Sequence, residues 1–113
     1  MNQGPDQAYD RGKLVELFGD DPRTLAEVER EFLDTAREAA REIGGTDDFT
    51  AIARAAHRLK GASGMIGALA LHQIAEAVEG AAKARDLSAV RGLCEMFDHE
   101  VRRVAEQAGL PVE

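Results

Sequence analysis

The chain has 113 residues and a formal net charge of −7 at pH 7, with no tryptophan and only 4% aromatic residues. This length fits one domain with a single core, and the acidic balance argues against a general nucleic-acid binder, which needs a basic surface. The alanine-rich, aromatic-poor composition favours closely packed helices over a sheet sandwich. A lone cysteine, the lack of a signal peptide and the lack of a bilayer-spanning apolar run predict a cytoplasmic protein without membrane contact.

The N-terminal region predicts a tail and a short helix. Residues 1–9 are polar and are expected to form a flexible tail before a helical domain over residues 10–109. Asp10 is a suitable N-cap for the short helix. One side of that helix is expected to carry Leu14, Leu17 and Phe18.

Four longer helices are predicted after it. The second helix starts at Asp21-Pro22 and ends near Ile43, where Gly44-Gly45 follows. A third helix opens after residues 46–48 and ends near residues 67–68. A fourth follows, and a fifth runs from an Asp86 cap to Gly109. No segment alternates with period two, so the predicted fold is all-α: an antiparallel up-and-down four-helix bundle with a short extra N-terminal helix.

The third helix separates an apolar stripe from an unusual polar side. At about 100° per residue, one stripe faces the core, and a different side is left to solvent. A glycine inside a helix costs about 1 kcal/mol relative to alanine, so bare positions beside a histidine suggest that something large must approach. The core stripe contains Ile52, Ala56, Leu59, Ser63 and Ile66, and the polar side contains His57, Lys60, Gly61 and Gly64.

Residues 55–67 and the apolar helix after them resemble the phosphoacceptor region of histidine-containing phosphotransfer (HPt) domains. The matching pattern is His57-x-Leu59-Lys60-Gly61-x-Ser63-x-x-x-Gly67, with Glu79 in the next helix. The resemblance implies that His57 accepts a phosphoryl group from a receiver-domain aspartate and passes it to another receiver. It implies a hybrid sensor histidine kinase and response-regulator receivers as partners, and a divalent metal held by the receiver instead of by this chain.

Hairpin geometry adds a facing carboxylate. In an antiparallel pair with its turn near Ala68, His57 and Glu79 lie at the same height, as do Lys60 and Glu76. A carboxylate that accepts the Nδ1–H of an imidazole leaves Nε2 as the nucleophile. The resemblance also places a Glu or Gln here. An ordinary solvated glutamate is the alternative interpretation of Glu79.

The neighbours of His57 have two interpretations each. Lys60, supported by Arg54 and Arg58, could stabilise a phosphoryl group, or it could only pair with Glu76. Gly61 and Gly64 could admit a docking partner, or they could serve close helix packing. The Ser63 hydroxyl is expected to bond the carbonyl one turn back.

Three other functions compete with that of a phosphocarrier. A helical adaptor that binds a receiver or signalling partner without carrying phosphate remains an alternative. A metal site built from His57, Glu79, His72 and Glu76 is disfavoured, because bundle metal sites need inward-pointing ligands. The glycine spacing does not match a phosphate-binding loop, and no kinase ATP site is recognisable, so the chain is predicted to be a non-enzymatic, monomeric phosphocarrier without a metal or cofactor of its own.

Overall fold

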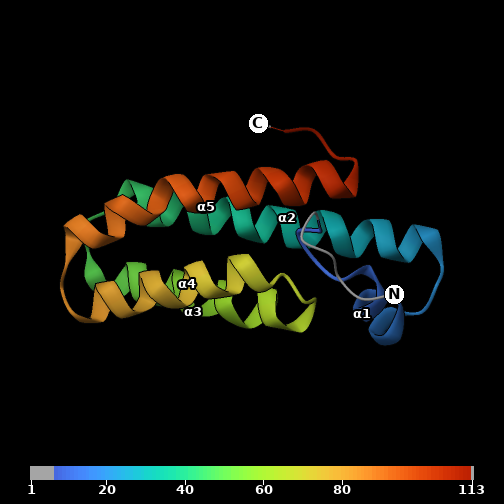
Figure 1. The fold of residues 1–113 in the computed structure, drawn as a ribbon, viewed down its shortest axis with the longest axis horizontal. Helices are drawn as coiled ribbons and strands as arrows, with labels where there is room; N and C mark the ends of the chain where they lie inside the picture. The colour runs from blue at the N-terminus through green and yellow to red at the C-terminus, as the bar shows by residue number, and fades with distance from the viewer. Residues whose placement is uncertain (1–6, 113) are drawn as a thin grey trace.

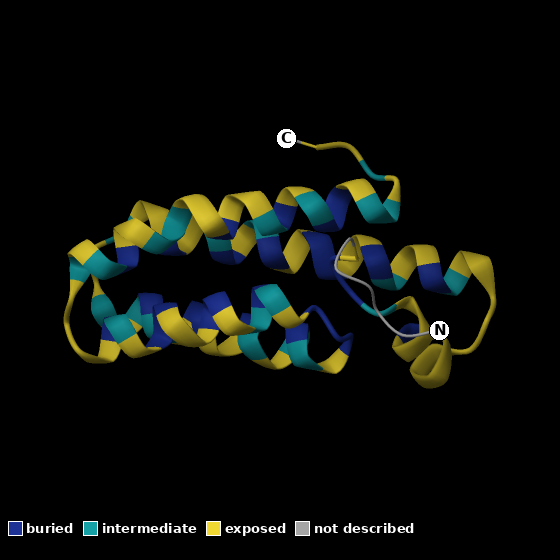
Figure 2. Cartoon of the chain, in the orientation of Figure 1, coloured by how far each residue is buried: buried dark blue, intermediate teal, exposed yellow. Residues whose placement is uncertain are grey.

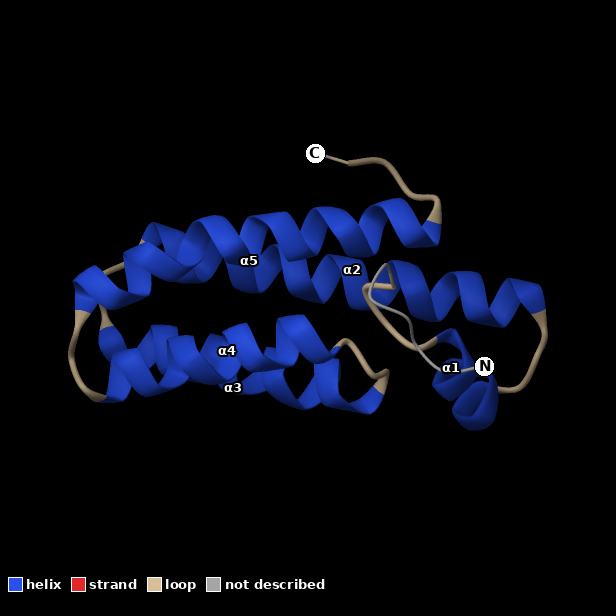
Figure 3. Ribbon diagram, in the orientation of Figure 1, coloured by secondary structure: helices blue, strands red, loops and turns tan. Residues whose placement is uncertain are grey.

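The computed structural model describes residues 7–112, and within that range it contains five α-helices and no strand. The helices are α1 (Arg11–Phe18), α2 (Pro22–Gly45), α3 (Phe49–Met65), α4 (Leu69–Lys83) and α5 (Leu87–Ala108). Figure 3 shows the short loops that join them. The all-α prediction is confirmed, and none of the described helices is both long and apolar enough to span a membrane.

The four long helices share one axis of an elongated molecule that measures 43 × 24 × 21 Å. In Figure 1, α2 and α5 lie side by side, α3 and α4 lie side by side below them, and α1 lies near one end. Helix α4 also packs on α5, and α3 packs on α2, so the two pairs enclose a common core.

The core is formed by the inward faces of these helices, which are dark blue in Figure 2. The apolar stripe predicted for α3 is buried, with Ile52, Ala56 and Leu59 fully inaccessible to solvent. Small residues such as Ala36 and Ala55 are also completely buried, and their size permits close helix approach. The single cysteine, Cys94, is half-buried against this core.

Helix α2 ends two residues later than predicted. It continues through Gly45 instead of ending near Ile43. Arg91 of α5 donates to the carbonyl oxygens of Ile43 and Thr46, both at 3.0 Å. These bonds satisfy acceptors that a helix end normally leaves open, so the two glycines need not stop the helix.

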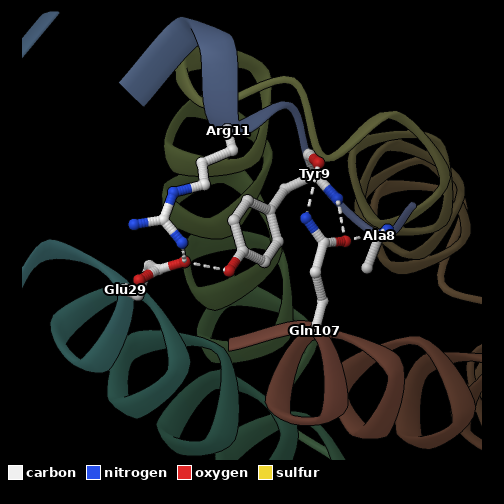
Figure 4. A network of polar contacts seen from close by, with 5 residues as sticks. All are labelled: Ala8, Tyr9, Arg11, Glu29 and Gln107. Atoms are coloured by element: carbon white, nitrogen blue, oxygen red, sulfur yellow. Dashed lines mark hydrogen bonds and ion pairs between the residues drawn. The ribbon is translucent and has the colours of Figure 1, made fainter. Parts of the chain in front are cut away.

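Residues 8–10 form a segment that we call the N-terminal strap, and its Ala8 and Tyr9 lie between α2 and α5 (Figure 4). The Gln107 side chain of α5 accepts from the Ala8 amide at 2.6 Å and donates to the Tyr9 carbonyl at 3.0 Å. The Tyr9 hydroxyl donates to buried Glu29 of α2. Ala8 and Tyr9 are therefore packed, which corrects the tail prediction at these positions. Residues 1–6 of that predicted tail lie outside the described range.

The strap also fixes the turn between α3 and α4. The Asp10 amide donates to the Ile66 carbonyl at 2.9 Å, and Gly67 beside it has φ +69°. A Cβ on Gly67 would lie 2.7 Å from the Asp10 Cβ, so this position requires glycine. The hairpin that carries the candidate site is thereby attached to the N-terminus of α1.

Helix α1 contributes one buried side chain to the core. Leu14 is fully buried, whereas Leu17 and Phe18 are 54% and 41% exposed. Of the three apolar residues expected on one side of this helix, only Leu14 therefore enters the core. Helix α1 lies near one end of the molecule (Figure 1).

Candidate functional site

His57 lies in the middle of α3, with its imidazole on the solvent side. Its side chain is 68% exposed, as the helical wheel predicted. The core stripe on the opposite side anchors the helix, so the direction of the ring is fixed by the burial of Ile52, Ala56 and Leu59. An exposed ring on a rigid helix is accessible to a large partner.

The His57 ring is held by a carboxylate from the neighbouring helix. Its Nδ1 lies 3.0 Å from Oε2 of Glu79 on α4, which confirms the contact predicted from the hairpin geometry. Glu79 itself is buried, with 6% exposure. An ionised carboxylate can only accept, so the hydrogen lies on Nδ1, and in a neutral imidazole the lone pair then lies on Nε2.

Two lysines bind the same carboxylate. Lys60 Nζ lies 2.9 Å from Oε1 of Glu79, and Lys83 Nζ lies 3.2 Å from Oε2. The alternative in which Lys60 only pairs with Glu76 is therefore corrected: its ion pair is with Glu79, although Glu76 is near enough to help raise the pKa of Lys60. Lys83 was not predicted as a site residue, although its position four residues after Glu79 on one helix is a recognisable signal for an ion pair.

These contacts keep Glu79 ionised. The hydrogen bond from Lys60 is the largest cause that lowers the pKa of Glu79 to about 2; Lys83 and His57 add to it, and burial opposes it. The same hydrogen bond raises the pKa of Lys60. Two ammonium groups thus share one carboxylate, and the cluster is net positive before the imidazole is counted.

Arginines on α3 extend this positive charge. Arg54 and Arg58 are exposed on the same helix, and Arg58 pairs with Glu42 of α2 at 2.9 Å. Both arginines line an open groove of about 560 Å³ that also borders His57 and Glu79. The groove runs between the first half of α3 and the end of α4.

The two glycines after His57 differ in their surroundings. Gly61 is exposed, and a Cβ there would meet nothing within 4 Å. A Cβ at Gly64 would lie 3.3 Å from Nδ1 of His72, whose ring bonds the Lys60 carbonyl at 2.9 Å. Gly64 therefore accommodates His72 in the α3–α4 contact, whereas Gly61 leaves open space beside the candidate phosphoacceptor.

Ser63 does not make its predicted bond. Its side chain is completely buried, and its hydroxyl has no hydrogen-bond partner among the described residues. The position on the core stripe directs the hydroxyl toward the packed interior and away from solvent.

The geometry argues against the metal-site alternative. Nδ1 of His72 is committed to a backbone carbonyl, and Glu79 is committed to Lys60 and Lys83. No group of three or more potential metal-binding side chains occurs within residues 7–112. The cluster is instead suited to binding negative charge that arrives at Nε2.

Comparison with known proteins adds one finding. No curated protein and no solved structure matched the chain. The profile of the Hpt domain family matches residues 14–107, which includes His57, Lys60, Glu79 and Lys83. Because this match covers most of the chain, the protein belongs to the family of Hpt domains, the histidine phosphotransfer modules of two-component signalling.

Proposed function

We propose that this protein carries a phosphoryl group on His57 between receiver domains of a multistep phosphorelay. The observation that carries the proposal is an exposed imidazole whose Nδ1 is bonded to a buried, ionised Glu79. This arrangement leaves the Nε2 lone pair free to attack phosphorus. An N–P bond forms, the bond from phosphorus to the partner's aspartyl oxygen breaks, and the partner recovers a free carboxylate.

Glu79 has a role throughout the proposed transfer. Attack through Nε2 leaves the ring protonated at Nδ1 and positively charged, and the neighbouring carboxylate stabilises that charge. The return transfer to a second receiver reverses the bond changes, and Nδ1–H again remains with Glu79. No general base of this chain is needed, because the attacking nitrogen carries no proton.

The surrounding cations complete the proposed site. A phosphoryl group adds nearly two negative charges, and Lys60 and Lys83 supply more positive charge than Glu79 neutralises. Arg54 and Arg58, with the open position Gly61 and the half-buried Gly64 one turn further on, are proposed to contact the docked receiver. The divalent metal and the remaining catalytic groups are assigned to that receiver, so the chain acts as a carrier and not as an enzyme.

The fold and setting are part of the same proposal. We take α2 to α5 as an antiparallel up-and-down four-helix bundle with α1 as the extra helix, a domain that ends near residue 109. It would act as a monomer in the cytoplasm, where its lone thiol remains reduced. Its partners would be response-regulator receivers and a hybrid sensor histidine kinase, without nucleic acid or membrane.

The test measures the transfer of radiolabelled phosphoryl group to this protein. A receiver domain loaded with radiolabelled phosphoryl group is mixed with wild-type protein and with His57→Gln. We expect acid-labile, alkali-stable label on the wild type and none on the variant. Label on His57→Gln at the wild-type rate would assign the chemistry to another residue. Binding of receivers by both proteins without any transfer would favour the alternative, an adaptor that carries no phosphate.

A further inference from the structure

The groove beside His57 has an apolar floor. Its volume is about 560 Å³, and it is open to solvent. Phe49 and Ala53 of α3 and Ala82 of α4 line it, and the small side chains of the two alanines leave the space that a larger residue would fill. Such a depression is suited to an apolar side chain from another molecule.

The rim of the groove is cationic. Arg54, Lys83 and Arg85 are all exposed along it. Among the described residues that line the groove, the only acid is Glu79, and its charge is already offset by two lysines. A protein with a net charge of −7 therefore presents a positive surface at this place, which favours an acidic partner.

Arg85 is held in position over the groove. Its guanidinium carbon lies 5.4 Å from the centre of the Phe49 ring, within the range of a cation–π contact. Its backbone adopts φ +57°, the left-handed conformation in which non-glycine residues are uncommon. This turn ends α4 and directs the arginine back across the start of α3, so one wall of the groove is formed before any partner binds.

We infer that this groove is a docking pocket for the receiver, and that it takes an apolar side chain flanked by carboxylates on the receiver surface. The inference rests on the proposed function, because His57 and Glu79 form one end of the groove. A receiver that brings its aspartyl phosphate to Nε2 must lie against this end. The apolar floor, with Arg54 and Arg85 on the rim, then selects among receivers without touching the reacting atoms.

Two variants test the pocket. Ala53→Phe fills the floor without changing charge, and Arg85→Glu reverses one rim charge while keeping a side chain at the same backbone position. With phosphorylated receiver as donor, we expect each variant to raise KM at least about tenfold and to leave kcat within about twofold. Ala77→Phe on the exposed side of α4 and Arg102→Glu on α5 are matched controls that should keep the wild-type KM.

A small donor separates docking from reactivity. Phosphoramidate phosphorylates histidine without occupying a docking surface, so its rate should not change in Ala53→Phe or Arg85→Glu. If the variants lose rate equally with phosphoramidate and with the receiver, the groove has no docking role. The docking role is also excluded if both variants keep the wild-type KM for the phosphorylated receiver. Circular dichroism checks that each variant is folded. If Ala53→Phe does not fold, the KM of Arg85→Glu alone tests the docking role. A wild type that accepts label from phosphoramidate but from no receiver would contradict the proposed function and the pocket together.

Complementation identifies the partner chemistry. A receiver in which one surface aspartate or glutamate near the phosphoacceptor is changed to lysine should lose transfer to the wild type. The same receiver should regain at least half of the lost efficiency with Arg85→Glu. If no such charge pair restores transfer across a scan of these receiver carboxylates, the acidic part of the inference is wrong.

Discussion

At the level of single residues, the site depends on one buried carboxylate with three neighbours. Glu79 contacts His57, Lys60 and Lys83 at distances between 2.9 and 3.2 Å. A buried charge is costly unless it is paired, and here each oxygen has at least one cationic or donor partner. The same acid therefore orients the imidazole and sets where both lysines lie.

The first prediction concerns stability and pH. The pKa of Glu79 is about 2 in the folded protein against a usual 4.5, so folding favours its ionised form. The stabilisation is complete above pH 4.5 and disappears as the pH falls toward 2. We therefore expect the stability difference between wild type and Glu79→Gln, measured by urea unfolding, to shrink across this interval. A difference that stays constant down to pH 2 would contradict the ion cluster.

The second prediction separates the two lysines from one another. Lys83→Met removes an exposed charge from Glu79 but leaves Lys60 in contact. Exposed pairs contribute about 0.2–1 kcal/mol, so we expect the equilibrium between phosphorylated receiver and phosphorylated His57 to shift at most about fivefold toward the receiver. Lys13→Met on α1 is the matched control. A larger loss for Lys13→Met than for Lys83→Met would exclude a local role of Lys83.

Some contacts of single residues in the site could be predicted from the sequence, and others could not. The pairing of His57 with Glu79 could be predicted, because residues equally far in sequence from the turn lie at the same height along the two helices of a hairpin. The partner of Lys60 could not be predicted in this way. A long, flexible lysine side chain can reach past the residue directly opposite to one a helical turn further on. The observed choice of Glu79 over Glu76 depends on burial, which favours pairing of the less solvated acid.

At the level of elements, the strap and the α3–α4 turn determine where the hairpin sits. Tyr9 and Gln107 are 98 positions apart in sequence, yet they share hydrogen bonds. Nothing local in residues 1–9 marks this contact, so sequence patterns predicted a tail instead. Helix starts were easier to predict: Asp10 and Asp86 do cap α1 and α5, because a cap is a local interaction.

The third prediction compares two glycines of the hairpin. Gly67→Ala places a Cβ at φ +69° and 2.7 Å from the Asp10 Cβ, and should destabilise the protein by roughly 1–3 kcal/mol. Gly61→Ala lies in open space within α3 and should stabilise it by up to about 1 kcal/mol. Thermal unfolding measures both. If Gly61→Ala is also slower in transfer from the receiver although it is more stable, the bare surface serves docking.

At the level of the whole molecule, charge is distributed unevenly. The chain is acidic overall, but the cations Arg54, Arg58, Lys60, Lys83 and Arg85 gather around the site on α3 and the end of α4. Composition alone predicted only an acidic protein that avoids nucleic acid. The local reversal of sign arises because the fold brings the two segments together, and it could not be seen in a net charge.

The last prediction follows from this distribution. A localised positive surface attracts an acidic receiver before contact, and such steering weakens as salt shortens the Debye length to about 8 Å at physiological ionic strength. We expect kcat/KM for transfer from the receiver to fall by about tenfold or more between low and high salt. Phosphorylation by phosphoramidate should show a much weaker dependence, because a small donor gains little from a broad surface. Arg85→Glu should flatten the salt dependence with the receiver, whereas Arg102→Glu should leave its slope unchanged. If kcat/KM depends equally on salt in the wild type, Arg85→Glu and Arg102→Glu, the attraction comes from the overall charge and not from the surface around His57.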